Sequence, residues 1–240
     1  MWERQVPALA AAGYRVVTGD LLGHGRSDRP SRPGSSYTVA DLADSLMRTL
    51  EEADIGRAAL AGFSLGGGVA LQIALARPDR VGALVLADTS AWMGPGAPAL
   101  FTERAAAVEA RGVEVLVQPA IARWFTPEFV AAHGDAVARY AARIGENDAY
   151  GYAAACRSLA TFDVRERLHA LRCPTLVVVG DRDQATPVAM AETLANGIPG
   201  AELRILGPAG HLLPEERWEA FNAVLLAFLS RVDVTSPGTT

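Results

Sequence analysis

The 240-residue chain lacks several features that would indicate something other than an ordinary globular protein. It has only two cysteines, Cys156 and Cys173, which excludes a disulfide scaffold and predicts two free thiols in a reducing compartment. No stretch approaches the roughly 18 consecutive apolar residues of a membrane span. We therefore expect a cytoplasmic protein. The alternative is that apolar residues 6–17 form a signal peptide, but Glu3 and Pro7 disfavour it.

The chain also lacks an excess of positive charge and any grouping of metal ligands. Its formal net charge is −5, which disfavours a nucleic-acid partner and favours a small-molecule or protein partner. No His, Cys and Asp side chains recur at metal-ligand spacing, so neither a metal nor another cofactor is expected. Hydrophobic residues make up 50% and charged residues 20%, which excludes a disordered or fibrous chain. No feature indicates an oligomeric state.

Apolar strands alternate with helical patterns through much of the chain. Continuous apolar strands of this kind are typical of a parallel sheet that is covered on both faces, so the predicted fold class is α/β with a mostly parallel sheet flanked by helices. Thr38 and Asp41 occupy the positions of a helix capping box. The strands are expected at residues 14–18, 57–63, 81–87, 175–179 and 201–206, and the helices at residues 2–12, 38–54, 65–77, 187–196 and 214–229.

The alternation stops after the third expected strand. Alanine-rich helical patterns such as 101–111 and 129–144 follow, with no convincing strand among them. This stretch is interpreted as a helical cap inserted between two strands of the sheet. The predicted division is a core of residues 1–91 and 169–232, a cap of residues 92–168, and a disordered tail of residues 233–240.

A G-x-S-x-G motif runs from Gly62 to Gly66 and lies between an expected strand and an expected helix. This strand–turn–helix context is the one that a nucleophile elbow requires, so Ser64 is the candidate nucleophile. The backbone N–H of Leu65, the next residue, is the candidate oxyanion donor. The alternative is a glycine-rich turn with an incidental serine. The spacing fits neither a P-loop nor a dinucleotide-binding fingerprint.

A serine nucleophile needs a base and an acid that orients the base. His211 follows the last expected strand, whereas His24 is interpreted as a structural loop residue. Asp183 lies past the fourth expected strand, far enough to reach over the sheet edge. Asp88, at the end of the third, is the rival acid. The chain order serine, aspartate, histidine is that of α/β-hydrolases.

On these motifs the chain resembles the α/β-hydrolase superfamily, in its branch with small helical caps. The resemblance runs from about Trp2 to Leu229 and is carried most specifically by residues 20–27, 62–67, 180–187 and 210–212. Softer motifs, at residues 86–90 and 151–156, are similar to those of 3-oxoadipate enol-lactonases and related carboxylesterases. The resemblance implies a serine hydrolase of a small carboxylic ester or lactone that works through an acyl-enzyme without a cofactor. The nucleophile is not an aspartate, which excludes the dehalogenase and epoxide hydrolase mechanisms.

The resemblance also implies an element that the sequence does not contain. In the family, a strand that ends in His-Gly precedes the helix matched by residues 2–12, and the following loop supplies a second oxyanion donor. No such segment precedes Trp2, so we expect Met1 to be an internal methionine of a longer protein. The alternative is a short form that is inactive or differently assembled.

Three functional alternatives therefore stay open beside an ester or lactone hydrolase. A cofactor-free haloperoxidase (perhydrolase) or a thioesterase would use the same three residues, and a non-catalytic binder would need none of them. The substrate pocket is expected in the cap, where aromatic and sulfur-containing side chains could line it. The candidates for this lining are Trp92, Met93, Trp124 and Phe125.

Overall fold

The fold is described from a computed structural model, which describes residues 1–232 of the chain. The predicted disordered tail, residues 233–240, lies outside the described residues. Both cysteines in the described part are free thiols. None of the helices within residues 1–232 is both long and apolar enough to cross a membrane.

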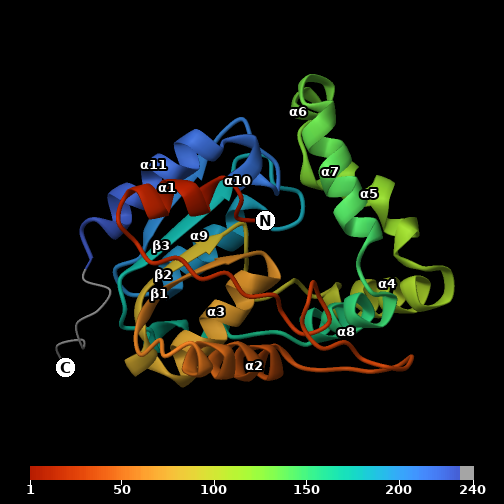
Figure 1. Ribbon diagram of the computed structural model, residues 1–240, viewed down its shortest axis with the longest axis horizontal. Helices are drawn as coiled ribbons and strands as arrows, with labels where there is room; N and C mark the ends of the chain where they lie inside the picture. The colour runs from red at the N-terminus through yellow and green to blue at the C-terminus, as the bar shows by residue number, and fades with distance from the viewer. Residues whose placement is uncertain (233–240) are drawn as a thin grey trace.

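A parallel sheet forms the centre of the molecule (Figure 1). Its strand order follows the chain, and each pair of neighbours is parallel. Every residue of the two inner strands is buried, as their unbroken apolar sequences predict. The predicted α/β fold class is confirmed. The strands are β1 (Ala58–Phe63), β2 (Val81–Ala87), β3 (Thr175–Gly180) and β4 (Glu202–Leu206).

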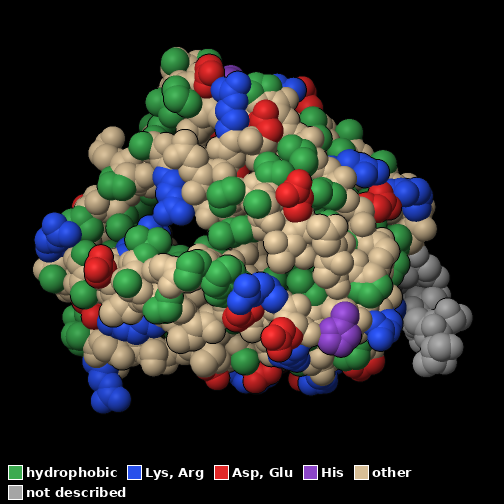
Figure 2. Space-filling model, turned by 180° about the vertical axis from the view of Figure 1, so that it is seen from behind, with side chains coloured by type: hydrophobic (Ala, Val, Ile, Leu, Met, Phe, Trp, Pro, Cys, Tyr) green, Lys and Arg blue, Asp and Glu red, His purple; other side chains and the backbone are tan. Residues whose placement is uncertain are grey.

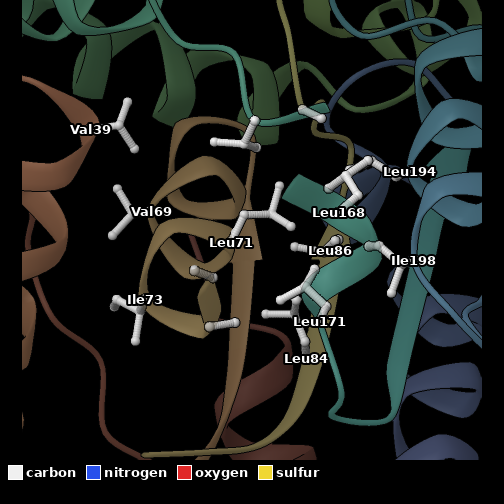
Figure 3. Close-up of a cluster of buried hydrophobic side chains, with 14 of the residues drawn as sticks. Val39, Val69, Leu71, Ile73, Leu84, Leu86, Leu168, Leu171, Leu194 and Ile198 are labelled. Carbon is white, nitrogen blue, oxygen red and sulfur yellow. The ribbon is translucent and has the colours of Figure 1, made fainter. Parts of the chain in front are cut away.

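Helices cover both faces of this sheet. Alternate residues of β2 point to opposite sides, so that Leu84 and Leu86 pack against one set of helices and Ala83 and Val85 against the other. Figure 3 shows the first cluster, in which leucine, isoleucine and valine side chains from the helices meet Leu84 and Leu86. That face is covered by α2 (Val39–Glu52), α3 (Leu65–Ala76) and α9 (Val188–Gly197), and the other by α1 (Gln5–Ala11), α10 (Leu213–Glu216) and α11 (Trp218–Leu229).

Five further helices lie between β2 and β3 in the chain and stand to one side of the sheet (Figure 1). They lie within residues 92–168, the segment for which the sequence predicts a cap, and the name cap refers below to this segment. Two of them, α4 and α8, pack closely through Phe101, Ala105, Ala153 and Cys156. The five are α4 (Ala97–Arg111), α5 (Val117–Trp124), α6 (Pro127–Ala132), α7 (Gly134–Gly145) and α8 (Ala149–Ala160), and short 3-10 turns occur at Pro78–Arg80, Val113–Leu116 and Arg165–Ala170.

Local sequence explains how α2 begins. The Thr38 hydroxyl accepts a hydrogen bond from the backbone N–H of Asp41, and the Asp41 carboxylate accepts one from the N–H of Thr38. The predicted capping box is therefore present. It satisfies two backbone donors that the helix itself leaves free.

The predicted strand at residues 14–18 is wrong. These residues have no strand conformation, and Val17 is exposed. Within residues 1–232, no strand lies beside them to accept their backbone hydrogen bonds. A short apolar segment forms a strand only when a neighbour pairs with it, and propensity alone does not supply one.

Two predicted helices are interrupted in the structure. The helix expected at 214–229 is broken at Arg217, whose φ of −127° and ψ of 42° lie outside the helical region. This break follows Glu216, whose side chain is held by partners outside the helix. The helix expected at 129–144 is broken at His133, just before Gly134, which favours helix poorly. Apolar periodicity continues across both breaks and does not reveal them.

Replacement of a central apolar side chain should measure how much this core stabilises the fold. Leu86 is fully buried in β2 and pairs with both Gly62 and Val177. We expect Leu86→Ala to lower the free energy of unfolding by about 2–5 kcal/mol, because it leaves a cavity that the sheet cannot close. Urea denaturation measures the change. The control is Leu100→Ala at an exposed cap position, which should alter stability by less than about 0.5 kcal/mol. Equal effects of the two substitutions would contradict the assignment of Leu86 to the core and of Leu100 to the surface.

Candidate active site

Ser64 lies on a sharp turn between β1 and α3. Its φ of 51° and ψ of −119° are unusual for a residue with a side chain. The turn is held by a 3.0 Å hydrogen bond from the Ser64 N–H to the carbonyl of Ala87 in β2. A Cβ on Gly62 would collide with the backbone of Gly66, and one on Gly67 would collide with Thr89. Gly62 and Gly67 therefore allow the close packing that places the Ser64 side chain at the sheet edge.

His211 lies on the loop after β4 and reaches the same edge. Its Nε2 is 3.0 Å from Ser64 Oγ, and its Nδ1 is 2.8 Å from Asp183 Oδ2. The imidazole is buried, and its ring centroid is 4.9 Å from that of Phe63 and 6.4 Å from the Trp124 ring. These contacts leave the ring little freedom to turn away from Ser64.

Asp183 lies on the loop after β3 and is held from several sides. Its Oδ1 accepts hydrogen bonds from the N–H groups of Ala185 (2.7 Å) and Thr186 (2.9 Å), and its Oδ2 accepts one from the Thr186 hydroxyl (2.7 Å). Burial alone would raise the pKa of Asp183, but the hydrogen bond and charge of His211 and the bonds from Thr186 outweigh it and lower that pKa. The carboxylate is therefore held in its ionised form beside the imidazole.

The two loops that carry Asp183 and His211 are joined to each other. Asp181 Oδ1 accepts a 2.9 Å hydrogen bond from the N–H of Ala209, and the N–H of Arg182 donates to the Ala209 carbonyl at 2.9 Å. Asp181 therefore stabilises the contact between the two loops and makes no hydrogen bond to the imidazole.

Asp88, the rival acid, has a different environment. It is fully buried, its Oδ1 accepts a 2.9 Å hydrogen bond from the Gly180 N–H, and its Oδ2 has no partner among the described residues. Burial, together with the nearby charge of Asp183, raises the pKa of Asp88 well above its ordinary value. The carboxylate hydrogen-bonded to His211 is thus that of Asp183.

The other three histidines lie elsewhere. His24 Nδ1 is 3.1 Å from the Leu22 carbonyl, and burial lowers the pKa of this imidazole. This is the structural loop position that the sequence predicts. His133 and His169 are exposed, and His133 packs on the Phe129 ring.

A small pocket opens beside Ser64. Leu65 is the first residue of α3, so no carbonyl of the helix accepts its backbone N–H. Met93 is the one candidate lining residue from the sequence that lines this pocket. Its walls are formed by Ser64, Leu65, Gly68, Thr89, Ser90, Met93, Leu159, Phe162 and Thr186.

The three aromatic candidates for the lining have other contacts. The Trp92 ring lies under the guanidinium of Arg165 at 3.8 Å. Phe125 is buried between Phe129 and Tyr140 in the cap. Trp124 is half-buried near His211.

Sequence reasoning missed Thr186 and Glu216. Thr186 lies three residues after Asp183, a spacing at which a hydroxyl commonly bonds an aspartate in a turn, and this signal could have identified it. Glu216 contacts the histidine loop and the cap through side-chain hydrogen bonds that no local pattern encodes.

Arginine supplies all the positive side chains near the site, because the chain contains no lysine. Every blue side chain in Figure 2 is therefore an arginine. That view shows a hollow in the surface with arginines at its margin.

The chain is similar to known hydrolases. A model of the alpha/beta hydrolase fold family matches residues 1–217. The 3-oxoadipate enol-lactonase 2 of Acinetobacter baylyi is 32% identical over 231 residues, which cover 96% of this chain and 84% of that protein. A Variovorax paradoxus protein named as a carbamate hydrolase is 34% identical over 244 residues, with 99% and 88% covered. The crystal structure of the enol-lactonase from Burkholderia xenovorans LB400 has a TM-score of 0.90 at 30% identity, with 95% and 85% covered. The resemblance inferred from the motifs is confirmed.

The pH dependence of stability should reveal the raised pKa of the buried Asp88 carboxyl. Its raised pKa means that the folded protein binds the proton more tightly than the unfolded chain, so its contribution to stability is lost as pH rises above about 4. We expect Asp88→Asn to become more stable than the parent by up to about 1.4 kcal/mol per pH unit, until the pH passes the raised pKa. Thermal melts of both proteins from pH 4 to 8 provide the measurement. A difference that stays constant over this range would contradict the assignment.

Proposed function

The chain belongs to the alpha/beta hydrolase fold family, and on this premise we propose that it is a serine hydrolase that cleaves a small carboxylic ester or lactone through an acyl-enzyme. One observation carries the proposal. Ser64, His211 and Asp183 form an unbroken hydrogen-bonded chain, with heavy-atom distances of 3.0 and 2.8 Å. These distances are within the range in which a nucleophile can pass its proton to a base.

The proposed reaction begins with the attack of Ser64 Oγ on the substrate carbonyl. His211 Nε2 takes the hydroxyl proton as the C–O bond forms, and later gives it to the leaving alkoxide oxygen. Asp183 accepts the Nδ1–H of His211, which fixes the tautomer and stabilises the imidazolium. Water then attacks the acyl-enzyme, with His211 acting as base again, and releases the acid and the free serine.

Charge develops on the carbonyl oxygen during both steps. The backbone N–H of Leu65, at the beginning of α3, is the donor that we assign to this oxyanion. The first turn of a helix also has a positive electrostatic potential, which favours negative charge at this point.

The substrate acyl group is proposed to bind in the pocket beside Ser64. Met93, Leu159 and Phe162 offer it apolar contacts. The hydroxyls of Thr89 and Ser90, in the same wall, donate to the backbone carbonyls of Ser64 and Trp92. Trp124 belongs to the proposed site through its position near His211. A small pocket with an apolar lining of this kind suits a small apolar part of a substrate.

Two arginines support an anionic group on that substrate. Arg123 of α5 donates through Nη2 to the carbonyl of Gln184 at 3.3 Å, directly beside Asp183. Within residues 1–232, neither Arg123 nor Arg104 forms an ion pair. Burial, followed by the charge of Arg104, lowers the pKa of Arg123. A substrate carboxylate would relieve this repulsion, and an enol-lactonase of 3-oxoadipate, a dicarboxylate, is among the relatives.

A carbamate is the second candidate substrate, because one relative that is 34% identical is named as a carbamate hydrolase. Attack by Ser64 would then form a carbamoyl-enzyme in place of an acyl-enzyme. A panel of p-nitrophenyl esters, lactones and carbamates would rank these classes by kcat/KM.

Substitution of the three proposed catalytic residues should abolish hydrolysis without unfolding the protein. We expect Ser64→Ala, His211→Ala and Asp183→Asn each to lower kcat for p-nitrophenyl acetate by about 10⁴-fold or more, and double variants to lose little beyond the singles, because the three residues act as a unit. Steady-state kinetics and circular dichroism measure activity and fold.

The matched control is His133→Ala, which removes an exposed cap histidine. It should keep parental kcat. Full activity of Ser64→Ala would refute the nucleophile, and a parent that turns over no ester, lactone or carbamate would refute the proposed function.

The effect of substrate charge should show whether Arg123 binds a substrate carboxylate or only supports the Asp183 loop. We expect Arg123→Gln to lower kcat/KM about 10-fold or more for an ester that carries a free carboxylate, because a charge-assisted bond of about 1.5–3 kcal/mol is lost. The same variant should change kcat/KM little for the neutral methyl-capped analogue. The comparison uses the ratio of the two kcat/KM values in parent and variant. An equal loss on both substrates would assign Arg123 to the Asp183 loop alone.

A further inference from the structure

The corner of the cap between α5 and α6, residues Trp124 to Thr126, touches the loop that carries His211. The backbone N–H of Leu212, next to the histidine, donates to the Trp124 carbonyl at 3.0 Å. On the other side of the histidine, a Cβ on Gly210 would come within 2.6 Å of the same carbonyl. The cap and the histidine loop are therefore in direct backbone contact.

Glu216 joins the same two segments through its carboxylate. Its Oε1 accepts hydrogen bonds from the N–H of Gly210 at 2.9 Å and from the N–H of Thr126 at 3.1 Å, and its Oε2 accepts one from the Thr126 hydroxyl at 2.6 Å. The Thr126 hydroxyl in turn accepts the Phe129 N–H and caps α6. One side chain thus satisfies a backbone donor of the histidine loop and two donors of the cap.

The preceding residue, Glu215, has the same side chain but contacts different partners. Its carboxylate is buried and pairs with Arg139 at 3.2 Å and Arg4 at 3.7 Å, and the Tyr140 hydroxyl lies at 3.4 Å. These partners belong to the N-terminal segment and to α7, and none lies on a loop of the proposed catalytic residues. Of these two adjacent glutamates, Glu216 contacts the loop of His211, whereas Glu215 makes contacts away from the site. Glu215 therefore serves as a matched control for Glu216.

We propose that Glu216 is a positioning residue of the hydrolytic site, which fixes the His211 loop to the α5–α6 corner of the cap. The proposal rests on the proposed function, because it concerns the geometry in which His211 serves Ser64. Ser64 and His211 lie on different loops, and Glu216 fixes the second of these loops to the corner of the cap. On this proposal, the 3.0 Å separation of Ser64 Oγ and His211 Nε2 is maintained in part by that junction. A displacement of about 1 Å at a catalytic group can cost about 10²-fold in rate.

The test compares three variants with the parent by steady-state kinetics on p-nitrophenyl acetate. We expect Glu216→Ala to lower kcat about 10²-fold while KM changes less than about 3-fold, because His211 acts in the chemical step and not in substrate binding. Glu216→Gln should keep most of the parental kcat, since its amide oxygen can still accept both backbone N–H groups. Glu215→Ala should keep parental kcat per folded molecule, although it melts at a lower temperature.

A second measurement does not depend on turnover. Hydrogen exchange followed by mass spectrometry should show faster exchange in peptides that cover residues 208–213 and 124–127 for Glu216→Ala, and parental exchange there for Glu215→Ala. If the parent hydrolyses no ester, the proposed function fails. Hydrogen exchange alone then tests whether Glu216 fixes the His211 loop to the cap. Parental exchange in both peptides of Glu216→Ala, or a kcat loss that Glu215→Ala shares, would overturn the proposal.

Discussion

Parallel pairing of the four strands is the constraint on which the rest of the structure depends. It brings the carboxyl ends of β1, β3 and β4 to one edge of the sheet, and each of these strands is followed by a loop with one residue of the hydrogen-bonded chain. Because β2 and β3 are buried on both faces, their register is fixed by apolar contacts with the covering helices. The position of the polar site therefore follows from an apolar core.

The loops of this edge are held by polar contacts that the sheet does not provide. Asp181 and Arg182 join the acid loop to Ala209, and Arg182 also pairs with Glu128 of the cap at 2.9 Å. Glu216 joins the histidine loop to the cap. The cap is thus connected to both loops. If the proposed function holds, a change in the cap sequence would alter the position of His211 as well as the shape of the pocket, and would so couple substrate choice to the chemical step.

The sequence predicts the parts of the molecule that depend on local patterns. Unbroken apolar strands, the capping box at Thr38 and the glycines around Ser64 each have a local physical cause, and the structure contains them. Residues 14–18 have the composition of a strand but no neighbour to pair with, so composition was misleading there. The break at Arg217 and the contacts of Glu216 arise from tertiary hydrogen bonds, which no periodicity records. The distinction between Asp183 and Asp88 likewise required the distance to His211.

Covalent labelling of the serine tests the central claim most directly. The native protein would be treated with a fluorophosphonate, and its intact mass and tryptic peptides measured. A fluorophosphonate reacts much faster with a serine that a neighbouring base activates than with an ordinary hydroxyl. The account predicts one adduct per chain, located on Ser64, and no adduct in His211→Ala or in heat-denatured protein. An unlabelled native protein, or an adduct on another residue, would contradict it.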